Sequence, residues 1–446
     1  MKAKNIFFII LFTWISFFPR PVQEKYSLFV NIFLFIAFGH LLLRKRKEIY
    51  KLGDYPMWVF LAATGINVFF AQQRNLAFNA YLNIALPMFF IYYLISEDFF
   101  SEGKFDLLAK IVGLCSIGVS LIGIFECIFR YNPLYAHLIE NPYYLRYISG
   151  FARPMSTQFN PTPLGGYLLG CLPFNYYLFK KTGSILRSLG VTGIVLNITV
   201  LILTFSRAAI LGLFSMALFY LFLRRKYKLI AVLAVALFML FSTFYYLPYP
   251  LSKLGMGWIF KDKLLPNYLS GGSYMAEGFL KDHPEIGPDR SKGASFADGD
   301  GILSSYRLER CAMALRMLKS NPLSGLGLQH FRARFYEYYR GKYRVPYDIM
   351  IADNMYLTIL AEAGLIGFFA FLLFIFIFLR RGREKLARLN NGSLLKLRLS
   401  VCLTALIGLL VNMAGYEFFY WPNQYLFFCV IVGCLNASLR INAVND

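Results

Sequence analysis

Twelve apolar runs divide the chain, and they restrict its fold more than any other feature of the sequence. Inside a bilayer the lipid offers the backbone no hydrogen-bond partner, so a run that crosses it must be a helix. The sequence therefore predicts an all-α polytopic membrane protein with about 12 transmembrane helices. The runs fall at about 5–18, 27–43, 56–71, 78–95, 107–129, 163–179, 188–205, 207–223, 228–247, 354–379, 394–415 and 420–438.

Composition supports this class. The chain of 446 residues is 58% hydrophobic, a share that soluble domains rarely reach. Its net charge of +22 would suggest nucleic acid as a partner if the protein were soluble. Here the basic residues cluster in short loops between apolar runs, as in the cytoplasmic loops of membrane proteins. We therefore expect no nucleic-acid partner.

The distribution of Lys and Arg predicts the orientation. If the N-terminus is cytoplasmic, the cytoplasmic loops carry the basic clusters at 44–47, 180–187, 224–228 and 380–398. The short loops on the opposite side carry few basic residues. This bias predicts that both termini are cytoplasmic.

Two longer polar segments then lie outside the cytoplasm. One is 130–162, and the other is 248–352, between the ninth and tenth helices. A loop of this second length is usually functional. We therefore divide the chain into helices 1 to 9 (1–247, with the outer loop 130–162), a partly helical extracytoplasmic loop domain (248–352) and helices 10 to 12 (353–446).

The second half of this loop domain has helical periodicity. Leu308, Cys311, Leu315 and Leu318 share one face at helical spacing. We expect these four side chains to form the apolar face of an amphipathic helix. The segment 320–331 follows it as a turn that contains Gly325 and Gly327.

No metal or nucleotide site is indicated. The seven cysteines show no CxxC spacing, and the four histidines are scattered along the chain. No Walker or Rossmann glycine motif is present. We expect no metal and no cofactor.

Several polar side chains fall at or near membrane depth on the outer side. Asp353 could be only a helix cap, Arg307 and Arg310 could be a solvated face, and Gly364 with Gly367 could only permit close helix packing. A guanidinium in a nearly continuous apolar stretch is costly, so Arg207 should face a cavity or a partner. The outward-facing candidates are Glu126, Arg153, Asn160, Arg207, Arg307, Arg310, Asp353 and Glu362.

Together these residues would place several arginines opposite a carboxylate at an outer cavity. Arginine binds phosphate bidentately, so an anionic lipid head group such as a polyprenyl diphosphate is the expected ligand. We expect Arg332, Arg334 and Arg340, further along the loop domain, to be solvated.

Four stretches in a fixed order resemble the O-antigen ligase and polymerase superfamily. They read FNPTPLGG, TFSRAAILG, YRLERCAMALRMLKSNPLSGLGLQHF and DNMYLTILAEAGLIG. The resemblance covers roughly residues 150–435. It implies a GT-C-like membrane architecture with one large extracytoplasmic loop between helices 9 and 10.

The resemblance also implies an activity. Such proteins are inverting, metal-independent glycosyltransferases at the outer face of the bacterial inner membrane. They move a glycan from undecaprenyl diphosphate to an acceptor glycan (polymerases) or to lipid A–core (ligases). Membrane lipid and a chain-length regulator are the other partners that we consider.

The resemblance assigns roles to individual residues. Arg207 matches the arginine of the family's Ser-Arg motif, and Arg307 matches the arginine that opens the loop helix. Arg310 is the alternative, because the register is ambiguous by one turn. These arginines would hold the diphosphate and stabilise the leaving group. Other expected contacts to the diphosphate or glycan are Arg153, Asn160, Asn354 and Glu362.

The sequence departs from the family at the proposed base. Ligases carry a histidine, a polar residue, nine further residues and then GxxG. Here Asp353 stands where histidine is expected, followed by Asn354 and, nine residues later, Gly364 and Gly367. A carboxylate can accept a proton from a hydroxyl, but nearby arginines make it a weaker base. The missing histidine favours a polymerase over a ligase.

Two further classes stay open. A flippase for lipid-linked glycan would also need many helices and a cationic cavity, but flippases usually show internal repeats and short loops. A structural subunit of an assembly complex would leave Arg207 without a role.

Overall fold

The computed structural model describes residues 3–18, 20–44, 55–98, 102–132, 134, 146–148, 151–158, 160–181, 183–229, 231–232, 299–340, 350–390 and 392–441. The structure in these ranges is largely helical. In chain order the helices are α1 (Ala3–Phe17), α2 (Arg20–Lys25), α3 (Ser27–Arg44), α4 (Tyr55–Phe70), α5 (Arg74–Ala80), the π-helical turn η2 (Tyr81–Ala85), α6 (Leu86–Asp98), α7 (Glu102–Phe129), α9 (Pro161–Lys180), α10 (Ser184–Leu203), α11 (Arg207–Leu223), α17 (Gly299–Ser320), α18 (His330–Ala333), α19 (Phe335–Tyr338), α20 (Met355–Arg388), α21 (Leu394–Met413) and α22 (Pro422–Arg440).

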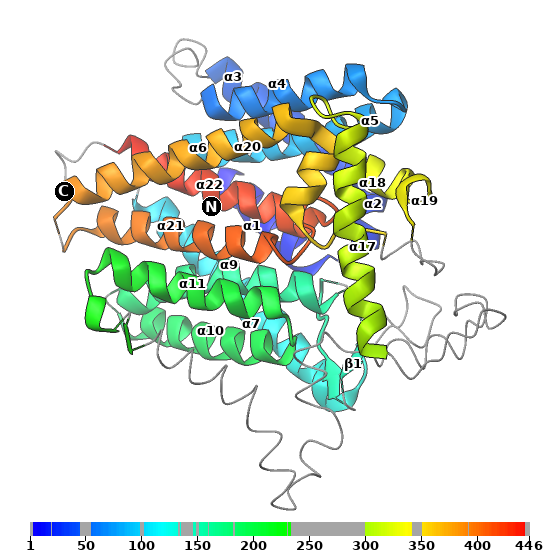
Figure 1. Cartoon of the computed structure of the whole chain (residues 1–446). Helices are drawn as coiled ribbons and strands as arrows, with labels where there is room; N and C mark the ends of the chain where they lie inside the picture. The colour runs from blue at the N-terminus through cyan, green and yellow to red at the C-terminus, as the bar shows by residue number, and fades with distance from the viewer. Residues whose placement is uncertain are drawn as a thin grey trace, which may run out of the picture.

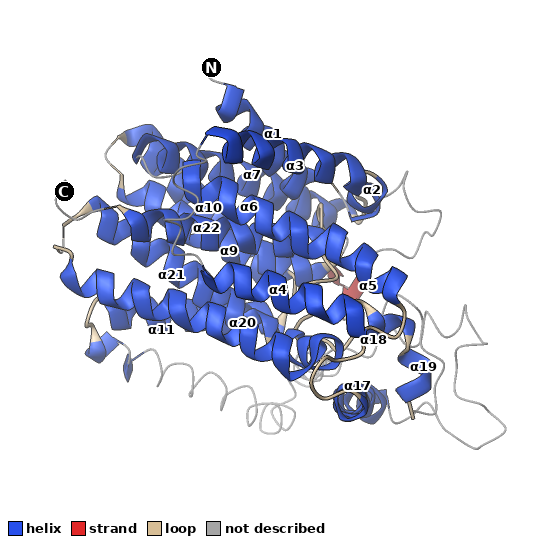
Figure 2. Ribbon diagram, turned by 90° about the horizontal axis from the view of Figure 1, so that it is seen from above, coloured by secondary structure: helices blue, strands red, loops and turns tan. Residues whose placement is uncertain are grey.

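The long helices run side by side as one bundle (Figures 1 and 2). Figure 1 shows α17, α18 and α19 together with the short helices α2 and α5 at one end of this bundle. We call this the loop end. The C-terminus lies at the opposite end.

The helices define a multi-pass membrane protein. Among the described residues, six helical stretches are long and apolar enough to cross a membrane, and α3, α4 and α11 are shorter apolar helices. Eleven of the twelve predicted runs fall in helices of the described residues; the other run, 228–247, lies almost entirely outside them. The total of twelve spans and the domain division at 247/248 and 352/353 therefore stay predictions.

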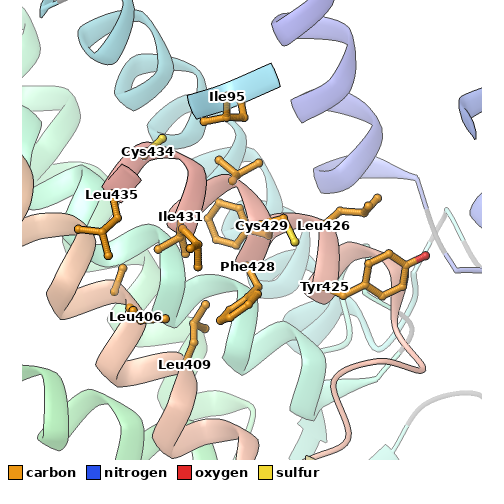
Figure 3. Packing of buried hydrophobic residues seen from close by; sticks show 14 of the residues in the cluster. Ile95, Leu406, Leu409, Tyr425, Leu426, Phe428, Cys429, Ile431, Cys434 and Leu435 are labelled. Carbon is orange, nitrogen blue, oxygen red and sulfur yellow. The ribbon is translucent and has the colours of Figure 1, made fainter. Parts of the chain in front are cut away.

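The core of the bundle surrounds α22. In its apolar stretch 89% of residues are buried, against 28% for α10, which lies at the periphery. Figure 3 shows why: Phe428, Ile431 and Leu435 of α22 pack among Ile95 of α6 and leucines of α21. At Gly433 the two backbones approach so closely that a Cβ would lie 2.8 Å from Ile95 Cβ. A small residue at a crossing point permits this approach.

The helix α20 is broken near its start. Gly364 has φ +64°, a conformation that glycine adopts without penalty, and it interrupts the helical hydrogen bonds. The turn before α18 replaces them. Leu326 N and Gly327 N donate to Ala361 O and Glu362 O at 3.0 and 2.9 Å, while Leu365 N donates to Pro322 O at 2.9 Å. The loop domain is thus fastened to α20 through backbone groups.

The structure confirms a helix in the second half of the loop domain but corrects its face. The buried residues of α17 are Arg310, Met313, Ala314 and Met317, which pack toward α20. Leu308 and Leu315, expected on the buried face, are 70% and 47% exposed. The prediction was based on the positions of the leucines. It overlooked the helix face that carries methionine and alanine, whose side chains are more adaptable or smaller.

The described part of the predicted outer loop 130–162 contains a short antiparallel hairpin of strands β1 (Arg146–Ile148) and β2 (Phe151–Arg153), in which Arg146 pairs with Arg153. The other elements of the described residues are helical, in agreement with the all-α expectation.

Candidate functional site

The first contact of the candidate site joins the loop domain to the start of α20. Arg310 of α17 forms a salt bridge with Asp353, and its other terminal nitrogen donates to Ile351 O at 2.9 Å. The side chain of Arg310 is 4% exposed, whereas that of Asp353 is 27% exposed. The arginine is therefore fixed in place while the carboxylate remains accessible to a ligand.

Asn354, and not Asp353, caps α20. Its side-chain oxygen accepts a hydrogen bond from Leu357 N at 3.1 Å, as a good N-cap does. Its amide nitrogen donates to Ala414 O at 2.9 Å, at the end of α21. Asp353 precedes the helix with φ +52°. Asp353 therefore does not cap the helix, and its carboxylate pairs with Arg310.

Arg207 is the first residue of α11, after a tight turn from α10. Phe205 takes φ +51° in this turn, and the Ser206 side chain caps α11. The next residue, Ala208, touches the loop after α21: a Cβ on Gly415 would lie 2.8 Å from Ala208 Cβ. Arg207 and Asn354 are thereby brought to the same short segment, Ala414–Gly415.

Arg153 and Asn160 converge on the same turn. Arg153 Nε donates to Thr204 O at 2.8 Å, at the C-terminus of α10. Asn160 caps α9 by accepting from Thr162 N at 3.1 Å. The start of α9 packs on this turn, since a Cβ on Gly165 would lie 3.3 Å from Thr204 Oγ1.

Glu126 shapes the segment between these two residues. It is buried in α7, and its Oε2 accepts from Met155 N, Ser156 N and Asn132 Nδ2 at 3.0, 2.7 and 3.1 Å. The carboxylate thus fixes the backbone that follows Arg153. Its contacts are those of a positioning residue.

The structure therefore gathers Arg153, Asn160, Arg207, Arg310, Asp353 and Asn354 around the junction of α10–α11, α17–α20 and α21–α22. Arg307 lies in α17, three residues before Arg310, but its side chain is outside the described residues.

Glu362 belongs to a second cluster, deeper along α20. Its Oε1 accepts from Tyr420 Oη at 2.6 Å and from Phe331 N at 2.9 Å, and its Oε2 accepts from Gln329 N at 2.9 Å. From the sequence we expect Glu362 to orient an arginine or Asn354 rather than to react. In the structure Glu362 interacts electrostatically with Arg332, while the side chain of Asn354 bonds to Leu357 N and Ala414 O. The carboxylate also holds the turn before α18 against the α21–α22 loop.

Arg332 corrects the sequence analysis. We expected a solvated side chain, yet it is 8% exposed and its guanidinium lies 4.8 Å from the centre of the Tyr420 ring. A cation over an aromatic face is favourable, and more so when water is excluded. Phe331 and Phe335, which lie four residues apart on either side of Arg332 in the sequence, are both buried and are a local sequence signal for this burial.

Glu417 was also missed. It lies between α21 and α22, is fully buried, and accepts a hydrogen bond from Thr358 of α20. Burial raises the pKa of Glu417 well above the usual range, and the nearby Glu362 and Asp353 raise it further. A carboxyl group whose charged form is disfavoured therefore lies beside the Asp353 cluster. Nothing in the isolated sequence AGYEFFYW indicated that this glutamate is buried.

These residues combine fixed cations with an accessible carboxylate at the loop end. Such a set can bind a phosphate-containing anion and can accept a proton from a hydroxyl. In the part of the chain that the structure describes, no group of three or more His, Cys, Asp or Glu side chains is placed to hold a metal ion.

Fold and site together define a multi-pass membrane protein with an arginine–carboxylate site at one end of its helical bundle. Residues 192–372 match the O-antigen ligase family model. This match confirms the resemblance to the O-antigen ligase and polymerase superfamily seen in the sequence. The match spans α10 to α20 and so includes Arg207, Arg310, Asp353 and Glu362. It indicates glycan transfer of the ligase or polymerase type.

A search of curated proteins gave no significant match.

Proposed function

We propose that the protein polymerises undecaprenyl-diphosphate-linked oligosaccharide at the extracytoplasmic face of the bacterial inner membrane. The observation that carries this proposal is the contact of the buried Arg310 with the accessible Asp353, inside the segment that matches the family. In this arrangement a cation for the diphosphate and a base for the acceptor lie side by side.

The proposed reaction is one inverting displacement. The acceptor hydroxyl oxygen attacks the anomeric carbon of the donor sugar, and the bond from that carbon to the diphosphate oxygen breaks. The hydroxyl proton passes to Asp353, and undecaprenyl diphosphate leaves with the electron pair. Arg207 and Arg310, with Arg307 as a third candidate, stabilise the charge that develops on the leaving oxygen.

Arg310 has two roles in this proposal. In the structure it pairs with Asp353. A diphosphate that binds Arg310 would compete with the carboxylate for the guanidinium and make the carboxylate available to the acceptor hydroxyl. Donor binding would thus prepare the acceptor side, which suits a transferase that must avoid reaction with water.

Three further residues are positioned to support this site: Arg153, Asn160 and Asn354. Arg153 stabilises the carbonyl end of α10, directly before Arg207. Asn160 and Asn354 cap α9 and α20, whose N-termini favour anions. Neither residue needs to react for its replacement to weaken donor binding.

The main alternative is a ligase that transfers the glycan to lipid A–core. The family match fits both reactions. The aspartate at position 353, where ligases carry histidine, favours the polymerase. A flippase for the same lipid-linked glycan is the second alternative, and it would need neither a base nor an acceptor.

The test is an assay of the purified protein with EDTA and an undecaprenyl-diphosphate-linked glycan, first without and then with lipid A–core. Longer lipid-linked glycan without core would establish a polymerase, and product only with core would establish a ligase. Loss of product on removal of metal would contradict the metal-independent mechanism. No product from a protein that moves the glycan across vesicle membranes would favour the flippase.

The variants Asp353→Ala, Arg207→Ala and Arg310→Gln should each lower kcat by about 100-fold or more, since base and oxyanion groups typically contribute that much. Arg316→Gln is the matched control, because Arg316 lies on the same helix as Arg310 but pairs with Glu309. Wild-type turnover in Asp353→Ala would remove this residue from the mechanism.

A further inference from the structure

A second candidate site lies at the loop end, around Arg332. A cavity of about 350 Å³ is lined by residues of α1, α2, α3, α5, η2, α6 and α22, together with Gln329 and the helix α18 that carries Arg332. This volume lies within the range of small-ligand pockets. Neither Asp353, Arg310 nor Arg207 lines it, so it is separate from the proposed transfer site.

The cavity has one sign of charge. Among the described residues that line it, Arg332 alone is charged; the other polar groups include the amides of Gln23, Asn31, Asn83 and Gln329. Gln23 is 2% exposed, and its Oε1 is buried without a hydrogen-bond partner. A cation with amides around it, and no carboxylate among the described residues of the wall, selects an anion that also accepts hydrogen bonds.

The surroundings hold Arg332 in place. Glu362, which is near enough to interact electrostatically with Arg332, already accepts hydrogen bonds from Gln329 N, Phe331 N and Tyr420 Oη. Tyr420 supports the guanidinium from one face. Gln329 takes φ +59°, a costly conformation for this residue type that its bond to Glu362 maintains. The turn is therefore constrained to present both side chains at the cavity.

The elements η2 and α3, which also line the cavity, are suited to contact a lipid tail. The π-helical turn η2 contributes Asn83 and Ile84, and π-helical turns are frequent at functional sites. On α3, Leu34 faces the cavity, while neighbouring Phe29 and Phe33 are exposed on the outer surface of the bundle. The helix α3 thus separates the cavity from the expected hydrocarbon layer of the membrane, and its outer side chains Phe29 and Phe33 are exposed.

We propose that this cavity binds the phosphate head group of a membrane amphiphile, with the phosphate at Arg332 and the hydrocarbon chain along α3 and α22. Two sources share this chemistry: a polyprenyl phosphate and an anionic phospholipid. The apolar wall from Trp14, Tyr425 and Leu426 suits the first carbons of either chain. Figure 3 shows Tyr425 and Leu426 at one end of the core cluster of α22.

The test is native mass spectrometry of delipidated protein in neutral detergent. The probes are undecaprenyl phosphate, dioleoylphosphatidylglycerol and the uncharged dioleoylglycerol. Arg332→Gln should weaken retention of a phosphate amphiphile about tenfold or more, because one charge-assisted hydrogen-bonding group is lost. Arg334→Gln, a neighbour that pairs with Glu337, is the control and should bind as wild type.

A second variant tests the site without altering the buried arginine. Ala333 is exposed and lines the cavity, so Ala333→Trp should cover its entrance and lower retention while the fold is kept. Arg310→Gln should abolish binding of a different molecule, at the proposed transfer site. The loss of bound lipid in this variant should therefore be additive with the loss in Arg332→Gln. Because this readout is binding, it remains valid if the proposed transferase activity fails.

A comparison of the probes also identifies which kind of phosphate amphiphile the cavity binds. An effect on undecaprenyl phosphate alone would mark a carrier-lipid site, and an effect on phosphatidylglycerol alone would mark a phospholipid site; equal effects would mark a general phosphate site. Unchanged retention in both Arg332→Gln and Ala333→Trp would overturn the proposal. So would equal, Arg332-dependent retention of dioleoylglycerol.

Discussion

At the scale of single residues, His330 joins the loop domain to the start of α5. It is fully buried, its Nε2 accepts from Gln73 N at 3.0 Å, and its Nδ1 lies 3.0 Å from Leu328 O. This pattern requires the neutral ring, with the proton on Nδ1. Burial lowers the pKa of His330 below its ordinary value.

Acid should therefore weaken this junction. Since the folded pKa is lowered, the unfolded chain binds the proton first, and stability falls as the pH drops below about 6.5, by at most about 1.4 kcal/mol per pH unit. Thermal unfolding of wild type and His330→Gln between pH 7.5 and 5.5 measures this effect. The midpoint should fall more in wild type, and equal slopes would show that His330 does not titrate in this range.

Glu417 should show the opposite pH dependence. Its raised folded pKa means that the folded state keeps a proton that the unfolded chain releases above about 4.3, so its contribution is lost as the pH rises. Glu417→Gln keeps the shape without the acid. The variant should match wild type near pH 4.5 and exceed it in unfolding temperature at pH 8.5. Destabilisation at both pH values would indicate an ionised and paired glutamate.

Residue types alone identified part of the site. Arg207 and Asp353 could be predicted, since a charge within or beside an apolar run has few structural uses. Arg332, Tyr420 and Glu417 could not, because their importance comes from one another. Glu362 and Tyr420 are 58 residues apart in the chain, and only the fold brings them together.

At the scale of elements, the broken helix α20 fixes the loop domain to the bundle. A Cβ on Gly364 would collide with the backbone of Leu323 and Gly325, and φ +64° is unfavourable for any other residue type. The sequence indicated Gly364 as a packing glycine. Its actual conformation could not be predicted, because it depends on the partner turn at 322–327.

Gly364→Ala should therefore destabilise the protein by about 3 kcal/mol or more, through backbone strain and loss of the turn contacts. Gly39→Ala in α3 is the control: a Cβ there meets nothing within 4 Å, so alanine should be neutral or slightly stabilising. Thermal unfolding in detergent compares the two. A Gly364→Ala variant as stable as wild type would mean that α20 can run straight.

At the scale of the whole molecule, the basic cluster of α20 and the loop domain lie at opposite ends of the helical bundle. Arg380, Arg381 and Arg383 lie in the last part of α20, away from the loop end that carries α17 and α18. The apolar runs alone predicted most of the helices, because lipid leaves no other backbone structure. They did not predict which helix is central, since α22 is less apolar in sequence than α10 and yet is far more buried.

The orientation can be measured with a thiol reagent that does not cross membranes. In a Cys311→Ser background, Tyr336→Cys at the loop end should react in intact spheroplasts, because Tyr336 is 52% exposed. Glu384→Cys, with a side chain 46% exposed at the other end, should react only after lysis. Labelling of Glu384→Cys before lysis would reverse the proposed topology.

The break at Gly364 also bears on how the chain is made. As one straight helix, the 34 residues of α20 would extend about 50 Å, well beyond a hydrocarbon layer of about 30 Å. The residues after the break, 365–388, suffice to span it, and their first part, 365–379, is uncharged and rich in phenylalanine. The insertion machinery can therefore release this segment into lipid and leave Glu362 behind in the aqueous exit. The segment that contains Glu362 is then enclosed later, when the loop domain folds against it. Assembly of the candidate site would be a late step of biogenesis, after the neighbouring helices are already in the membrane.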